Sequence, residues 1–99
     1  MSREFASREH AMSFVAVMLG VSARSFVKEP GLHVGGIDAG LLDHPDTSKE
    51  TKDRIRARLA SDEGFSVEKD GKRFRIVIGA FRDGFDCWVF GESGLGTRL

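Results

Sequence analysis

The stretch of residues 64–90 constrains the fold more than any other part of the chain. Within it, Asp70-Gly71 and Asp83-Gly84 each separate runs of β-branched and aromatic residues. An Asp-Gly pair between such runs is the strongest short-range hairpin signal, because glycine tolerates the positive φ that tight hairpin turns require. The stretch therefore predicts three antiparallel strands joined by two hairpins.

The alternation of side chains fixes the register of the first hairpin. A two-residue turn at Asp70-Gly71 gathers the apolar residues on one face, whereas a three-residue loop sets Val67 against Arg73 and turns the whole set over. We therefore predict the two-residue turn. Its core face carries Phe65, Val67, Phe74, Ile76 and Ile78.

The second hairpin has two possible registers. A two-residue turn at Asp83-Gly84 puts Cys87 and Val89 on the core face, whereas a three-residue loop puts Trp88 and Phe90 there. Burying two large rings stabilises more than burying Cys and Val, at about 25 cal/mol per Å² of apolar area. We predict the second register.

The opposite face of the predicted sheet also carries apolar residues. Val77, Phe81 and Phe85 are expected there, with Arg82 and Asp83 at the rim. A sheet that is apolar on both faces needs a second cover, and an uncovered apolar patch usually marks an interface. These five residues are the predicted partner-binding surface. The alternative, given equal weight, is that the loop 31–42 folds over them.

The rest of the chain divides by its local signals. A cap at Ser7 and a stop at Gly20 predict a helix, and Ser22 can begin a second, short helix that ends before Pro30. Thr47 and Glu50 match a capping box, which opens a further helix. The prediction is one α+β domain over 1–99, in which N-terminal helices pack on a three-stranded antiparallel β-meander. Its parts are a helical segment 1–30, a Gly-rich loop 31–45 with a short strand at 32–34, a helix 46–60, the meander 64–90 and a mobile tail 91–99.

Charge and cysteine content limit the function classes. The chain has 15 basic and 15 acidic residues, which argues against reliance on a large phosphate-neutralising surface. Its one cysteine cannot form an internal disulfide, which favours a reducing compartment. No apolar run approaches the ~20 residues that span a bilayer. We expect a cytoplasmic protein that makes no membrane contact.

The polar residues match no catalytic or metal-binding pattern. Cys87 has no neighbouring His in the sequence, and residues 91–95 fail the G-x-S-x-G pattern at the last position. The acidic and histidine residues between 33 and 46 lack the spacing of zinc or calcium ligands, and each is more simply a turn former or helix cap. They are His33, Asp38, Asp43, His44 and Asp46. We therefore predict no enzyme, no metal and no cofactor.

Residues 12–28 resemble a helix-turn-helix. Ala16 stands at the helix crossing, Gly20 in the turn and Ser22 at the cap of the second helix. In that family the second helix enters the DNA major groove. The resemblance implies base contacts from Ala23, Arg24, Ser25 and Lys28, although Glu29 and Pro30 depart from the pattern and leave that helix barely two turns long.

The basic helix 47–60 and the hairpin 65–78 resemble the last helix and wing of a winged-helix domain. This resemblance implies phosphate contacts from Lys69, Lys72, Arg73 and Arg75 of the hairpin, whereas most such charge runs are solvated faces. The nucleic-acid-binding set of this alternative is Arg24, Ser25, Lys28, Arg54, Arg56, Arg58, Lys72, Arg73 and Arg75.

A non-catalytic docking protein is the function that these features favour. Compact, neutral α+β chains of this size resemble in type the accessory proteins of phages and mobile elements, including anti-defence inhibitors of the anti-CRISPR type. We expect a regulator or inhibitor that docks on a macromolecular partner. A protein is the first expected partner and a homodimer is a further candidate. The alternative is a helix-turn-helix or winged-helix DNA-binding transcriptional regulator.

Overall fold

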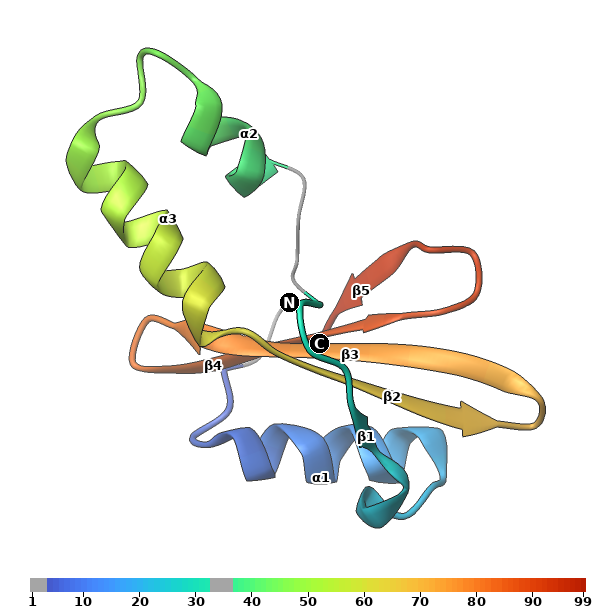
Figure 1. The fold of residues 1–99 in the computed structure, drawn as a ribbon. Coiled ribbons are helices and arrows are strands. Elements are labelled where there is room, and N and C mark those ends of the chain that lie inside the picture. The colour runs from blue at the N-terminus through green and yellow to red at the C-terminus, as the bar shows by residue number, and fades with distance from the viewer. Residues whose placement is uncertain (1–3, 33–36) are drawn as a thin grey trace.

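The computed structural model describes residues 4–32 and 37–99, and it combines helices with one antiparallel sheet (Figure 1). This confirms the α+β class, but the sheet has five strands where three were predicted. The predicted strand at 32–34 falls partly outside the described residues. In chain order the elements are α1 (Arg8–Leu19), the 3₁₀ turn η1 (Ala23–Ser25), β1 (Val27–Lys28), α2 (Ile37–Asp43), α3 (Lys49–Ser61), β2 (Glu63–Lys69), β3 (Lys72–Phe81), β4 (Gly84–Phe90) and β5 (Gly96–Arg98).

The two strands that were not predicted lie at the edges of the sheet. The strand order is β1-β2-β3-β4-β5, so every strand pairs with its neighbour in sequence. The 3₁₀ turn η1 and β1 together replace the short helix predicted after Ser22. Its end is extended because the residue before Pro30 is pushed toward extended geometry and Glu29 N donates to Gly64 O at 2.8 Å. β5 replaces part of the predicted mobile tail by pairing Arg98 with Trp88.

The helices begin and end close to the predicted positions. Ser7 caps α1 by accepting a hydrogen bond from His10 N at 3.2 Å, and Gly20 ends it with φ 70°. α3 is capped by Ser48 rather than by the predicted Thr47, since the Ser48 side chain accepts from Thr51 N at 3.2 Å. Between them, α2 occupies part of the predicted loop 31–45 and contacts α3.

The first hairpin has the predicted register. Val67 lies opposite Phe74 and Phe65 lies opposite Ile76. Positive φ angles of 54° at Asp70 and 77° at the following glycine make the two-residue turn. Four of the five predicted core residues of this hairpin are buried, and Phe74 is half-buried.

The predicted register of the second hairpin is wrong. The turn lies at Arg82-Asp83, with Phe81 opposite Gly84, so that Ile78 faces Cys87 and Ile76 faces Val89. The small residues Cys87 and Val89 thus share a cluster with Ala11 and Val15 of α1. Trp88 and Phe90 consequently lie on the other face.

The N-terminal chain fixes this register from outside the hairpin. Phe5 N donates to Phe85 O at 2.8 Å, and Phe85 N donates back to Phe5 O at 2.9 Å. A Cβ atom at Gly84 would lie 2.6 Å from Phe5 O, so only glycine permits this approach. Local turn signals cannot predict a contact between residues so far apart in the sequence.

Cys87 provides a pH test of its position in the core. Its side chain is buried, and desolvation, followed by the Asp86 carboxylate, raises the pKa of the thiol from 9.0 to about 12. The unfolded thiol ionises first, so the stability that the neutral thiol contributes is intact below pH 9 and is lost as the pH rises toward 12. We expect a loss of about 2 kcal/mol by pH 10.5.

Urea unfolding of the wild type and Cys87→Ala at pH 8 and pH 10.5 isolates this effect. The alanine variant lacks the thiol but keeps every other titrating group, so the stability difference between the two proteins should narrow at high pH. Parallel losses in both proteins would place Cys87 outside the core.

Candidate functional site

The sheet has helices on both sides (Figure 1). One face packs against α1 and carries Cys87 and Val89, and we call it the α1 face. The other face lies toward α3, and we call it the α3 face. Register places the following residues of β3, β4 and β5 on the α3 face: Arg73, Arg75, Val77, Phe81, Asp86, Trp88, Phe90 and Arg98.

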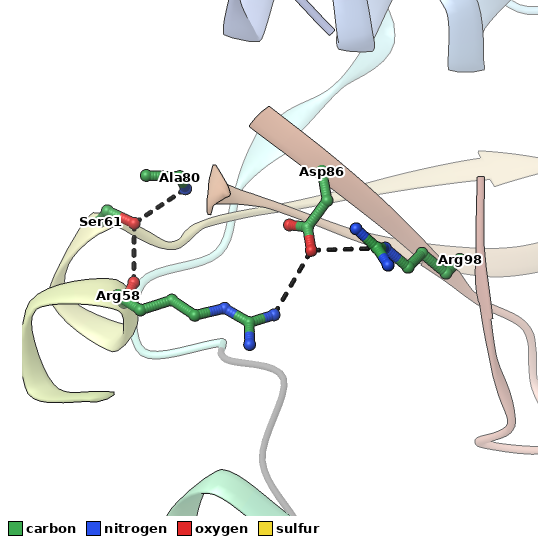
Figure 2. Close-up of polar contacts among 5 residues, drawn as sticks. All are labelled: Arg58, Ser61, Ala80, Asp86 and Arg98. Carbon is green, nitrogen blue, oxygen red and sulfur yellow. Dashed lines mark hydrogen bonds and ion pairs between the residues drawn. The ribbon is translucent and has the colours of Figure 1, made fainter. Parts of the chain in front are cut away.

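The C-terminal end of α3 is fastened to the sheet beside the β3–β4 turn (Figure 2). Ser61 Oγ accepts a hydrogen bond from Ala80 N at 2.9 Å and donates one to Arg58 O at 2.7 Å. Arg8 of α1 donates to Ser61 O at 2.8 Å. These bonds join α1, α3 and β3 at one corner of the molecule.

Asp86 is the central charge of this corner. Its side chain is only 3% exposed and lies 3.3 Å from Arg58 Nη2 and 3.5 Å from Arg98 Nε (Figure 2). A carboxylate taken out of water needs such partners, because desolvation of an unpaired charge costs several kcal/mol. Since Arg58 belongs to α3 and Arg98 to β5, the pairs hold both elements against β4. We call Asp86, Arg58 and Arg98 the Asp86 cluster, and its arrangement is best explained as an anchor for α3 and β5.

Arginine side chains cover Phe81. The guanidinium carbon of Arg98 lies 4.3 Å from the ring centroid, that of Arg82 lies 5.1 Å away and that of Arg58 lies 5.9 Å away. Such contacts are favourable through the negative face of the ring. Phe81 is half-buried as a result, rather than part of an open apolar patch.

The predicted partner-binding residues do not form one surface. Val77 is 1% exposed. Phe85 lies on the α1 face, opposite Ala80, with Arg8 over its ring at 4.6 Å. Arg82 is exposed at the β3–β4 turn together with Asp83. The displacement of Phe85 follows directly from the wrong register, because a one-residue slip moves every side chain to the other face.

The α3 arginines of the predicted nucleic-acid set are paired with carboxylates. Arg54 lies 3.9 Å from Glu50, and Arg56 lies 3.3 Å from Asp53. Arg58, the third, belongs to the Asp86 cluster described above. The basic face of α3 thus carries its own counter-charges.

The remaining predicted DNA contacts come from separate places. Arg24 and Ser25 belong to the 3₁₀ turn, where the resemblance required a recognition helix, and Lys28 belongs to β1. Lys72 lies at the tip of the β2–β3 hairpin, while α3 joins the opposite end of the sheet (Figure 1). At about 3.3 Å per strand residue, β3 separates these ends by roughly 30 Å. Helix and hairpin are therefore not adjacent.

The open end of the α3 face contains a cleft that sequence reasoning missed. Its volume is about 300 Å³. Phe90 lies opposite Arg75 in the β3–β4 register, so the correct register would have brought these two residues together from the sequence. We call it the Arg73–Phe90 cleft. Among the described residues, its lining comprises Leu32, Arg73, Arg75, Phe90, Gly91, Glu92 and Gly94.

Glu29 holds the two arginines of the cleft. It accepts a hydrogen bond from Arg73 and lies 3.8 Å from Arg75 Nε. The Glu29 side chain is 25% exposed, whereas those of Arg73 and Arg75 are 50% and 52% exposed. The Glu29 side chain is thus more shielded from solvent than the two arginine side chains that it pairs with.

Leu32 reaches the cleft because β2 has a glycine beneath it. A Cβ atom at Gly64 would lie 2.5 Å from Leu32 Cβ and 2.7 Å from Glu29 O. Contacts this short are not tolerated, so Gly64 is what lets the segment 29–32 lie close to the sheet. No role in forming a site was predicted for Gly64 from the sequence.

Among residues 4–32 and 37–99, no group of three or more His, Cys, Asp or Glu side chains is arranged to hold a metal ion. His44 Nδ1 accepts a hydrogen bond from Asp46 N at 3.2 Å, as expected of a turn, and His33 lies outside the described residues. Within the described chain, every helix is too short or too polar to cross a bilayer.

Neither a protein-family model, nor a curated protein, nor a solved structure matches this chain. The Asp86 cluster and the Arg73–Phe90 cleft are therefore interpreted from their own chemistry.

Proposed function

We propose that this protein is a small non-catalytic regulator or inhibitor that docks on a protein partner. The observation that carries the proposal is the Arg73–Phe90 cleft, where two half-exposed guanidinium groups lie beside the half-buried Phe90 and Leu32. The resemblance in size and charge to accessory proteins of phages and mobile elements supports a role of this kind.

The composition of the cleft favours a protein partner. Binding energy at protein interfaces concentrates in a few residues, and arginine and aromatic residues are enriched among them. Arginine supplies planar donors that match carboxylate and carbonyl groups, and an adjoining ring supplies apolar area. Arg75 and Phe90 are cross-strand partners, so the sheet holds both groups in fixed relation.

Duplex DNA is the second candidate, and the placement of the basic residues argues against it. Arg54 and Arg56 lie on α3, whereas Lys72 lies at the tip of the β2–β3 hairpin, so these residues do not form one phosphate-binding surface. We expect purified protein to bind duplex only weakly at 150 mM salt, with a dissociation constant no tighter than about 10 μM. Tight binding that falls by roughly a factor of 10³ between 50 and 200 mM salt would promote the DNA-binding function instead.

Affinity capture from cells that naturally contain the protein tests the proposal. Arg75→Gln removes one cleft charge at a half-exposed position, and Arg54→Gln is a matched control on α3, where the side chain is 75% exposed. We expect the same protein to be retained after nuclease treatment by the wild type and the control, and to be lost with Arg75→Gln. Loss of all retained material with nuclease would contradict a protein partner.

A further inference from the structure

The Arg73–Phe90 cleft has a chemistry specific enough to name what enters it. Resting on the proposed docking function, we infer that it takes a carboxylate carried beside an apolar group, supplied by an acidic residue next to a large apolar residue on the partner protein. The inference follows from the charge pattern, the apolar lining and the size of the cleft.

The two arginines already accept one carboxylate from this chain. Arg73 and Arg75 are two positions apart along β3, so both side chains lie on the same face of the sheet. Glu29 pairs with both of them. Each guanidinium has five N–H donors in a planar fork, more than one carboxylate can occupy. With half of each side chain exposed, the remaining donors can bind a second carboxylate from the solvent side.

The apolar part of the cleft comes from residues next to these donors. Phe90 is fixed by stacking on Trp88, with ring centroids 6.4 Å apart and planes inclined by 20°. Leu32 adds a half-buried aliphatic surface. Beside them, a Cβ atom at Gly91 would meet no atom within 4 Å, so the approach over this glycine is open.

The size of the cleft limits what enters it to about one acidic and one apolar side chain. Its volume of about 300 Å³ is at the lower end of ligand pockets, which run from roughly 300 to 1,000 Å³. A phenyl ring with a carboxylate fits this range. The probe for the site is accordingly phenylacetate, and its neutral counterpart is phenylacetamide.

Glu92 tests whether the cleft binds a negatively charged ligand. It lines the cleft, it is exposed, and its charge has the same sign as the inferred ligand. Its carboxylate therefore weakens carboxylate binding, and Glu92→Gln should strengthen it by about twofold, because exposed charges interact only weakly through water. A cleft that selected cations would respond in the opposite direction.

The experiment is an NMR titration of the full chain with each probe. We expect phenylacetate to shift the amide signals of Phe90, Gly91 and Gly94 with a dissociation constant on the order of 1 mM, the strength typical of so small a ligand. Phenylacetamide should bind about fivefold more weakly, because it lacks the charge that strengthens hydrogen bonds to guanidinium.

The variants separate charge from geometry. Arg75→Gln should weaken phenylacetate binding about fivefold, Arg75→Lys should restore part of the loss, and Arg54→Gln should leave binding unchanged. Preserved amide spectra outside the cleft show that each variant is folded. Equal binding of the two probes, weaker binding by Glu92→Gln or shifts elsewhere on the sheet would overturn the inference.

Failure of the carboxylate inference and failure of the docking function would give different results. If the cells yield a protein partner that Arg75→Gln loses while phenylacetate and phenylacetamide bind alike, docking stands and the carboxylate inference is wrong. If phenylacetate binds as expected but no protein is captured, the cleft chemistry stands and the docking function is wrong.

Discussion

Ile78→Ala is expected to lower the free energy of unfolding by about 3 to 5 kcal/mol. Ile78 is fully buried at the centre of β3, where it lies opposite Cys87 of β4 and shares a cluster with Val15 of α1. Truncation removes buried methyl groups and leaves a cavity that a sheet bounded by a helix cannot close. The loss is a large fraction of the 5–15 kcal/mol that a domain of this size typically has.

Urea unfolding monitored by circular dichroism measures the loss. Val17→Ala is the matched control, because this α1 residue is 82% exposed and its truncation should change stability by no more than about 0.5 kcal/mol. Equal losses in the two variants would mean that α1 does not pack on the face of the sheet described here.

Asp86→Ala is expected to cost about 2 to 4 kcal/mol. The carboxylate is 3% exposed and neutralises Arg58 and Arg98, whose side chains are 31% and 25% exposed. Removing it leaves two partly buried guanidinium groups without this partner, which is costlier than the net value of the pairs themselves. Both α3 and β5 lose an ion pair with β4.

Salt separates this cluster from ordinary surface pairs. Glu50→Ala, which removes the exposed partner of Arg54, should cost less than about 0.5 kcal/mol, and that small cost should disappear at 1 M salt. The cost of Asp86→Ala should largely persist there, because buried pairs are weakly screened. If the two variants behave alike, Asp86 is not the buried centre of an anchor.

The parts of the fold that could be predicted depend on local chemistry. The turn at Asp70-Gly71 needs only two residues with positive φ, and α1 needs only a cap at Ser7 and a stop at Gly20. Their signals stand next to the structures that they specify. The antiparallel sheet and the α+β class follow from them.

The second hairpin could not be predicted in this way. Its register depends on the two hydrogen bonds between Phe5 and Phe85 and on the close packing of α1, both of which join distant parts of the chain. Area alone favoured burying Trp88 and Phe90, but these long-range contacts fix the register that places Cys87 and Val89 in one cluster with Ala11.

The wrong register of the second hairpin also prevented prediction of the candidate site. The cleft joins Leu32, Arg75 and Phe90 from three segments, and only the observed register puts Arg75 opposite Phe90. Arg73 and Arg75 were predicted to contact phosphate, whereas the structure pairs both with Glu29, which follows the edge strand β1 in a segment that was predicted as helix. The residues were found, but their chemical setting was not.

Photo-cross-linking from the rim of the cleft tests the docking function most directly. Benzoylphenylalanine at the exposed position of Glu92 should yield a nuclease-resistant adduct with one protein in cells that naturally contain the chain, and Arg75→Gln in the same molecule should abolish it. The same probe at the exposed position of Arg56 on α3 should give no such adduct. An adduct from Arg56 alone, or one with nucleic acid, would contradict docking through the Arg73–Phe90 cleft.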